Sequence, residues 1–224
     1  MDPQIEENQG KNMADACKEA GVERFIWSSL PNVSKVSNGK LTIVNHFDSK
    51  AHVEEYVRSI GVPSTFLMPG MFMSHALGSK RKNDQGIYVF NVPFDPKTTR
   101  IPIFDAANDS GLFVGAILLH GSSTLGKRIL AAAGYFTPDE IAQTLGEVTG
   151  TKTVTNRITY KQFQDALPPR EAKEVTATYY LVESLEYYAG EPADALDKSI
   201  ELVTSAGLRK PTSWKAYLEK NTKA

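Results

Sequence analysis

The stretch HFDSKAHVEEYVRSIGVPSTFLMPG, residues 46–70, contains a helix pattern that is followed directly by a strand pattern. Four apolar side chains in its first part share the i, i+3, i+4, i+7 spacing of an amphipathic helix: Val53, Tyr56, Val57 and Ile60. Gly61 would end this helix, because glycine readily adopts the left-handed conformation found just after a helix. The apolar run STFLMPG, residues 64–70, then predicts a short buried strand closed by a Pro-Gly turn.

A helix followed by a strand is also predicted just upstream. Residues 6–20, EENQGKNMADACKEA, are rich in helix formers and are followed by Gly21. Residues 22–29, VERFIWSS, place three bulky apolar side chains in a row, which is typical of a strand buried on both faces of a parallel sheet. Two strand–helix units in succession predict an α/β domain with right-handed crossovers.

The pattern repeats further along the chain. Residues 105–122, DAANDSGLFVGAILLHGS, predict a helix with Asp105 or Asp109 near its start. Residues 127–134, KRILAAAG, predict one more buried strand. The order of elements therefore favours a parallel sheet with flanking helices.

A helix start is most clearly marked at residues 137–150, TPDEIAQTLGEVTG. Thr137 is a good N-cap, Pro138 suits the first helical position, and Glu140 stands where it completes a capping box. After this helix the β-branched, half-polar run TKTVTNRITY gives way to helical stretches. These are expected at residues 160–166, 170–189 and 213–220, and they predict a smaller, mainly helical lobe.

Composition excludes several classes of protein. The chain has 25 Lys and Arg against 26 Asp and Glu, without the basic tract that a direct nucleic-acid binder needs. Cys17 is the one cysteine, and the four histidines show no metal-ligand spacing, so neither a disulfide nor a metal site is expected. The acidic start is unlike a signal peptide, and the longest apolar run, residues 112–119, is too short to span a membrane. These features predict a soluble cytoplasmic protein, with nuclear residence as a further option.

Phosphate-binding glycine motifs are missing from this sequence. The 16 glycines form neither GxGxxG nor GxxGxxG, and the P-loop pattern is absent as well. The chain opens on a helix pattern, so a parallel sheet built from it is expected to have few strands. We therefore expect an incomplete parallel sheet, of which further strands lie upstream of these residues.

Residues 9–40, QGKNMADACKEAGVERFIWSSLPNVSKVSNGK, and residues 46–72 closely resemble the NmrA-like family. This family is a branch of atypical short-chain dehydrogenases/reductases that is widespread in fungi, and weaker similarity continues to the terminal SWKAYLEKN. The resemblance implies a Rossmann-like domain that binds NADP(H), or NAD(H), and a smaller C-terminal lobe. We expect residues 1–135 to form the partial cofactor domain and residues 136–224 the small substrate or partner lobe, with residues 83–102 as a possible crossing between them.

The resemblance also implies roles for individual residues. Lys50 matches the lysine that in relatives contacts the nicotinamide ribose, and His46 occupies the position of the usual catalytic tyrosine. Ser28, with Ser29 next to it, matches the serine that polarises a substrate carbonyl. The remaining expected cofactor-lining residues are Gln9, Lys11, Met71, Phe72, Met73 and Ser74.

The residues themselves support part of this assignment. His46 and Lys50 are one helical turn apart and continue the apolar stripe of their helix, so both are expected to point inward. A half-buried lysine can donate hydrogen bonds to a ribose, and a histidine with a pKa of about 6.5 can pass a proton. The alternatives stay open: an ordinary helix-start histidine, a solvated lysine, and polar serines at the end of a strand.

Three functions are compatible with the sequence. The first is an NAD(P)(H)-dependent oxidoreductase that reduces a small carbonyl or imine, possible in fungal secondary metabolism. The second is a non-catalytic regulator of nitrogen metabolite use that senses the NADP(H)/NAD(P)+ state and binds a transcription factor, which the missing tyrosine favours. The third is a truncated chain without function. The expected partner is accordingly a small-molecule substrate or a transcription factor, with neither nucleic acid nor membrane.

Overall fold

The computed structural model describes residues 2–222, which fall into two compact units. The first unit contains the residues up to Pro69, Ser110–Ala131 and Tyr188–Lys210. The second contains Gly70–Asp109, Ala132–Tyr187 and the residues from Pro211 onward. Residues 83–102, considered above as a crossing between lobes, lie wholly within the second unit. The assignment of separate roles to residues 1–135 and 136–224 stays a prediction.

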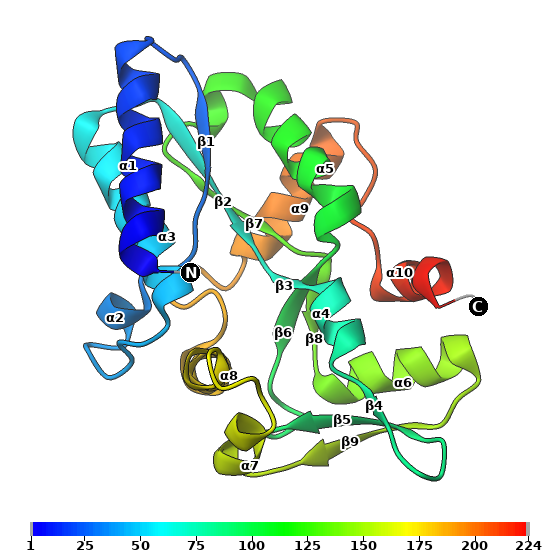
Figure 1. Ribbon diagram of the computed structural model, residues 1–224. Helices are drawn as coiled ribbons and strands as arrows, with labels where there is room; N and C mark the ends of the chain where they lie inside the picture. Colours follow the sequence, from blue (N-terminus) through cyan, green and yellow to red (C-terminus); the bar gives the residue numbers. More distant parts are fainter. Residues whose placement is uncertain (1, 223–224) are drawn as a thin grey trace. The chain divides into compact units, whose positions relative to one another are not determined.

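The first unit is built on a parallel sheet (Figure 1). Its strands are β1 (Phe25–Ser28), β2 (Ser64–Pro69) and β7 (Arg128–Ala131), in the order β1-β2-β7. Both strand pairs are parallel, with Trp27 opposite Phe66 and Phe66 opposite Arg128. The predicted α/β class with a parallel sheet is therefore confirmed.

Helices α1 and α3 lie side by side against this sheet (Figure 1). The helices of the first unit are α1 (Pro3–Glu19), α2 (Val33–Val36), α3 (Asn45–Ile60), most of α5 (Ala106–Leu119) and α9 (Ala195–Ser205). Asp2 caps α1 by accepting a hydrogen bond from the backbone N–H of Gln4, at 2.9 Å. As predicted, α3 ends at Gly61, which adopts a left-handed φ of 74°.

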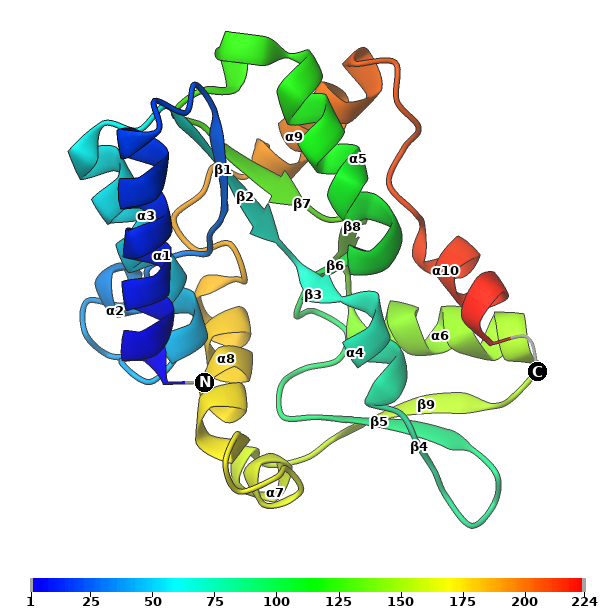
Figure 2. The same cartoon turned by 45° about the horizontal axis from the view of Figure 1, so that its top comes forward.

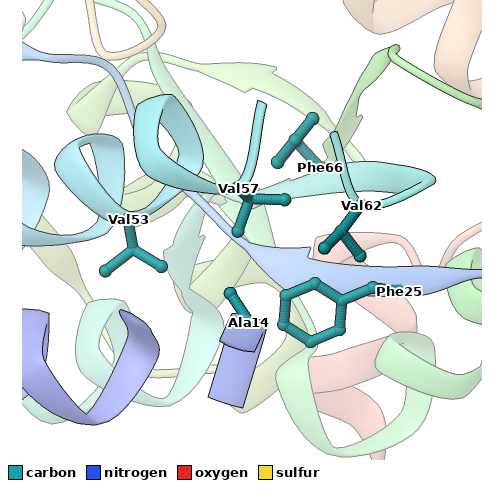
Figure 3. Packing of buried hydrophobic residues seen from close by; sticks show 6 residues of the cluster. All are labelled: Ala14, Phe25, Val53, Val57, Val62 and Phe66. Carbon is teal, nitrogen blue, oxygen red and sulfur yellow. The ribbon is translucent and has the colours of Figure 1, made fainter. Parts of the chain in front are cut away.

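The apolar stripe of α3 forms the core of this unit (Figure 3). Val53 and Val57 are fully buried and pack against Phe25 of β1 and Phe66 of β2. Ala14 joins them from α1, and Tyr56 and Ile60 pack at the edge of the cluster. The helical spacing seen in the sequence thus corresponds to the face that holds α3 on the sheet.

The prediction that the strand at residues 22–29 is buried on both faces is wrong. Phe25 is buried, but Ile26 and Trp27 are only half-buried and Ser28 is exposed. The reason is position, because β1 is an edge strand of its sheet and pairs with β2 alone. Phe25 and Trp27 pack toward the helices, while the alternate residues point to the opposite face.

The second unit contains two small sheets. One joins β3 (Met71–Phe72), β6 (Ile101–Phe104) and β8 (Gly134–Phe136), and the other joins β4 (Arg81–Lys82), β5 (Tyr88–Val92) and β9 (Thr153–Arg157). Its helices are α4 (Met73–Gly78), α6 (Pro138–Thr149), α7 (Tyr160–Asp165), α8 (Ala172–Leu185) and α10 (Trp214–Asn221). A short 3-10 helix, Gly121–Thr124, belongs to the first unit.

The ends of the helices in the second unit follow from local chemistry. Thr137 and Glu140 form the predicted capping box, with Glu140 N donating to Thr137 Oγ1 at 3.2 Å and Thr137 N donating to Glu140 Oε2 at 2.8 Å. The helix predicted over residues 170–189 is shorter than expected, because Glu186 adopts a positive φ of 67° that ends α8. In the described part of the chain, every helix is too short or too polar to cross a lipid bilayer.

Candidate functional site

The loop between β1 and α3 is fixed by a carboxylate in the first turn of α3. Asp48 is buried and accepts hydrogen bonds from the backbone N–H groups of Val33, at 2.6 Å, and Ser34, at 3.2 Å. The hydroxyl of Ser34 donates to the same carboxylate. Asp48 thereby ties the start of α2 to the start of α3, where the expected site residues lie.

Lys50 pairs with an acidic residue of α1. Its ammonium donates to the carboxylate of Glu6 and, at 3.3 Å, to the backbone carbonyl of His46. Glu6 also accepts a hydrogen bond from the hydroxyl of Ser49, at 2.7 Å. The Lys50 side chain is 24% exposed, so the ammonium lies at the rim of the α1–α3 contact rather than in bulk solvent.

The surroundings of Glu6 favour its charged form. Burial alone would raise its pKa, but hydrogen bonds from Lys50 and Ser49 lower it, as do the charges of Lys50 and His46. The net effect is a pKa below the ordinary value of a glutamate. Glu6 is therefore ionised under most conditions, which keeps the Lys50 ammonium in place.

The backbone of Lys50 is attached to the sheet. The indole N–H of Trp27, in β1, donates to the carbonyl oxygen of Lys50 at 3.0 Å. A lysine ammonium has three N–H donors, and among the described residues Glu6 and His46 accept from it. One N–H of Lys50 can therefore serve a bound molecule without breaking either contact.

His46 and the two serines are placed differently. His46 is half-buried, and its ring meets that of Phe47 edge-on with 4.8 Å between the ring centroids. Ser28 ends β1 and is exposed, whereas Ser29 is completely buried and donates its hydroxyl hydrogen to Glu54. Of the two serines, only Ser28 has an accessible hydroxyl. The catalytic roles expected for His46 and Ser28 stay predictions.

The QGK segment of α1 has a packing role that the sequence did not reveal. A Cβ on Gly10 would lie 2.6 Å from a methyl group of Val53 and 2.8 Å from the Trp27 ring, so only glycine fits here. The flanking Gln9 is exposed, and Lys11 pairs with Glu7 at 3.5 Å. Cofactor contacts by Gln9 and Lys11 stay predictions.

The expected cofactor residues Met71–Ser74 belong to the second unit. Met73 is fully buried at the start of α4, as expected for a residue that fills a core, whereas Ser74 is exposed. Phe72 is 37% exposed, and its ring lies 5.4 Å from the His75 ring. Met71 is half-buried in β3. Cofactor binding by these four residues stays a prediction.

A buried ionic network is centred on Glu54, and the sequence does not predict it. This carboxylate is completely buried and accepts hydrogen bonds from Arg58, at 2.9 Å, and Arg128, at 2.8 Å, besides the one from Ser29. Arg128 also donates to Glu191 at 2.8 Å. The signal was present, because polar residues recur every fourth position of α3 in the series His46, Lys50, Glu54 and Arg58.

Comparison with known proteins identifies relatives of two kinds. The chain is 31% identical to the Nitrogen metabolite repression protein nmr of Neurospora crassa, over 65% of this chain and 31% of the relative. It is 30% identical to the Nitrogen metabolite repression protein nmrA of Emericella nidulans, over 68% and 44%. It is 27% identical to the NmrA-like family domain-containing oxidoreductase lnaB of Aspergillus flavus, over 74% and 50%. The matches cover half or less of these relatives' length.

Solved structures share the fold. Nmra, a negative transcriptional regulator solved in complex with NAD, matches with a TM-score of 0.78 and 23% identity, over 95% of this chain and 68% of that one. The triphenylmethane reductase of Citrobacter sp., complexed with NADP(H), matches with a TM-score of 0.69 and 20% identity, over 98% and 72%. At these identities the likeness concerns the Rossmann-like fold.

The family is established by a match that runs along nearly the whole sequence. The sequence model of the NmrA-like family matches residues 2–218, which include every element from α1 to α10 except the last three residues of α10. The resemblance seen in the residues around Lys50 is thereby confirmed. The chain belongs to the NmrA-like family.

Proposed function

We propose that this chain contributes to an NAD(P)(H)-dependent oxidoreductase that reduces a small carbonyl or imine. The observation that carries the proposal is the setting of Lys50, which is anchored by Trp27 at the backbone and by Glu6 at the ammonium and keeps one N–H available. Family membership supports it, as do the NAD and NADP(H) complexes of proteins with the same fold. NADP(H) is the first candidate and NAD(H) the second.

The residues of this chain fit the ribose end of such a cofactor. Lys50 would donate its remaining N–H to a ribose hydroxyl, because an anchored ammonium is a good donor to hydroxyl oxygens. Ser28 would donate its exposed hydroxyl to the substrate oxygen or nitrogen, and His46 would hold the proton. The cofactor, when bound, supplies the hydride. The sequence offers no glycine-rich turn for the pyrophosphate, so no residue is proposed for that part.

A second candidate is a regulator that binds the cofactor without turning it over. The observation that favours it is the histidine at position 46, because the reach and geometry of an imidazole differ from those of the phenol that the resemblance implies for a catalytic member. Two relatives carry the name nitrogen metabolite repression protein. In this alternative, Lys50 would still bind the ribose, and a transcription factor would be the partner.

The first experiment measures cofactor binding. Isothermal titration calorimetry of the chain with NADPH and with NADH is expected to give a dissociation constant that Lys50→Ala weakens about tenfold, by the loss of one charged hydrogen bond. Lys161→Ala is the matched control, because this lysine is 80% exposed on α7. Absence of heat with millimolar cofactor would contradict both the oxidoreductase and the cofactor-sensing regulator.

The second experiment distinguishes the two candidates. NADPH consumption is followed against a panel of small aldehydes, ketones and cyclic imines. Turnover that disappears in Lys50→Ala and falls in Ser28→Ala supports the oxidoreductase. Cofactor binding without turnover of any panel member supports the regulator instead.

A further inference from the structure

The outer strand of one sheet in the second unit exposes its backbone. The sheet order is β4-β5-β9, so β9 has β5 on one side and stands at the edge (Figure 2). Tyr88 N donates to Lys152 O at 3.0 Å, and Ile158 N donates to Val92 O at 2.9 Å. In a parallel ladder the backbone groups of successive residues alternate between the two sides. The even-numbered residues of β9 therefore face β5, and Thr153, Thr155 and Arg157 direct their N–H and C=O groups outward.

These outward groups are available for pairing. Outside the sheet ladder, none of the hydrogen bonds described for residues 2–222 uses the backbone N–H or C=O of Thr153, Thr155 or Arg157, and the alternation of the ladder directs these groups away from β5. The edge lacks two of the usual protections, because residues 153–157 contain no proline and pair with β5 in continuous register; its one charged side chain is Arg157, at the end of the strand. Three of the five residues are β-branched, which favours an extended conformation. β9 is thus a regular edge strand open to a further strand.

A groove runs beside this edge. It has a volume of about 760 Å³ and is lined by residues of α6 and of the β9 segment from Gly150 to Thr155. Helix α6 packs over β9 (Figure 2). The carboxylate of Asp139 in α6 accepts a hydrogen bond from the hydroxyl of Thr155 in β9. A strand added to β9 would therefore run along α6, with alternate side chains facing the helix.

The helix wall of the groove is acidic. Pro138–Thr149 contains Asp139, Glu140 and Glu147 and no lysine, arginine or histidine. Asp139 and Glu147 line the groove from the helix side, where Glu147 is exposed, and Lys152 lines it from the strand side. An added strand would be favoured if the side chains facing α6 were lysine or arginine, because opposite charges across a contact are attractive.

We propose that β9 binds an extended basic segment of another protein, which adds as a fourth strand to the β4-β5-β9 sheet. Backbone hydrogen bonds to Thr153, Thr155 and Arg157 would supply affinity, and the acidic residues of α6 would select basic side chains at alternate positions. The site lies entirely within the second unit and does not depend on the cofactor-binding role of Lys50.

Synthetic peptides test the proposal directly. The probe is a fluorescein-labelled, acetylated Lys-Val-Lys-Thr-Lys-Val peptide, followed by fluorescence anisotropy with the full chain. A peptide with glutamate in place of lysine is expected not to bind. Two further peptides carry N-methyl groups on one or the other alternate set of amides. Because only one set faces β9, one of them should lose binding and the other should retain it. Equal binding of both N-methylated peptides would overturn the proposal.

Two variants at Thr155 separate the contribution of the backbone N–H to probe binding from that of the side chain. Thr155→Ala and Thr155→Pro both lose the hydroxyl that contacts Asp139, but only proline also removes the outward N–H. We expect about tenfold weaker probe binding for Thr155→Pro than for Thr155→Ala, as for a lost hydrogen bond. Circular dichroism of both variants checks that they fold. Equal affinities would contradict strand addition at β9.

A charge reversal on α6 tests whether its acidic residues attract the basic probe. Sedimentation equilibrium tests whether a second copy of this chain occupies the edge of β9 instead. Glu147→Lys should weaken probe binding about fivefold, whereas Glu201→Lys, on the exposed surface of α9 in the other unit, should not change it. Sedimentation equilibrium is expected to give a monomer. A dimer that Thr155→Pro dissociates would mean that a second copy of this chain occupies the edge, and would overturn the proposal.

Discussion

The carboxylate of Glu6, on α1, holds the ammonium of Lys50, on α3, across 44 positions of sequence. The two helices are further joined by Glu7, which accepts from His52 at 2.7 Å, and by Asp15, which accepts from the hydroxyl of Tyr56 at 2.6 Å. The acidic face of α1 thus packs against a face of α3 that carries basic and aromatic side chains. The placement of Lys50, the residue proposed to contact the cofactor, depends on this contact between helices.

The Glu6–Lys50 pair should make stability depend on acid pH. Because the pKa of Glu6 is lowered in the folded chain, its contribution is present above about pH 4.5 and is lost as pH falls through that lowered value. Glu6→Gln should lower the free energy of unfolding at neutral pH by about 1 kcal/mol or less, because the pair is partly exposed. Urea unfolding at neutral pH and at about pH 3 measures this effect. The difference in the free energy of unfolding between the parent chain and Glu6→Gln should be smaller at the lower pH. The exposed Glu19→Gln serves as control, and a difference that is constant with pH would contradict the pairing.

Gly10 should be intolerant of a side chain. In Gly10→Ala the new methyl group would meet Val53 and Trp27 below 3.0 Å, and a β-branched valine cannot move aside easily. We expect a net loss of about 1–2 kcal/mol in urea unfolding, despite the better helix propensity of alanine. Gly111→Ala is the matched control, because a Cβ there meets nothing within 4 Å. A neutral or stabilising Gly10→Ala would show that α1 approaches α3 less closely.

Removal of the Glu54 charge should be costly. Glu54→Gln leaves the guanidinium groups of Arg58 and Arg128 without their shared carboxylate, so we expect a loss of about 3 kcal/mol or more in the free energy of unfolding. Glu55→Gln, at the neighbouring position with a side chain 49% exposed, should change stability by less than about 0.5 kcal/mol. Similar losses in the two variants would mean that the buried network contributes little.

The capping box at the start of α6 gives a matched pair of variants. Thr137→Ala removes the acceptor for the N–H of Glu140 and should cost about 1 kcal/mol. Thr137→Asp keeps an acceptor and adds a favourable charge at the helix start, so its stability should stay close to that of the parent chain. Thermal unfolding of the parent chain and the two variants provides the comparison. An unchanged melting temperature of Thr137→Ala would contradict a stabilising role of the capping box.

The elements that sequence predicts best are those governed by local rules. The stripe of α3 repeats with the period of a helix, and the box formed by Thr137 and Glu140 needs only neighbouring residues. The burial of β1 depends instead on which strands pair with it. Strand pairing is a non-local property of the chain. The sequence of β1 predicts a strand buried on both faces, yet Ser28 is exposed at the end of an edge strand.

The candidate site was predictable in part for the same reason. The sequence located Lys50, but the partner of Lys50 is a glutamate 44 positions away, and no periodic pattern connects the two. Gly10 lies between Gln9 and Lys11, for which cofactor contacts are predicted, but its own close approach to Val53 exists only once the two helices pack together. Contacts between distant segments are decided by the tertiary structure. One amino-acid sequence does not show which distant residues meet.

The interleaved make-up of the two units limits how this chain can be dissected. Each unit draws on three separate segments, so the polypeptide passes between them repeatedly, once within α5. Truncation anywhere after residue 131 but before residue 188 would discard α9, which packs on β7. A fragment ending at residue 135 would thus expose one border of the parallel sheet to water. Functional mapping of this protein is better served by point substitutions than by shortened forms.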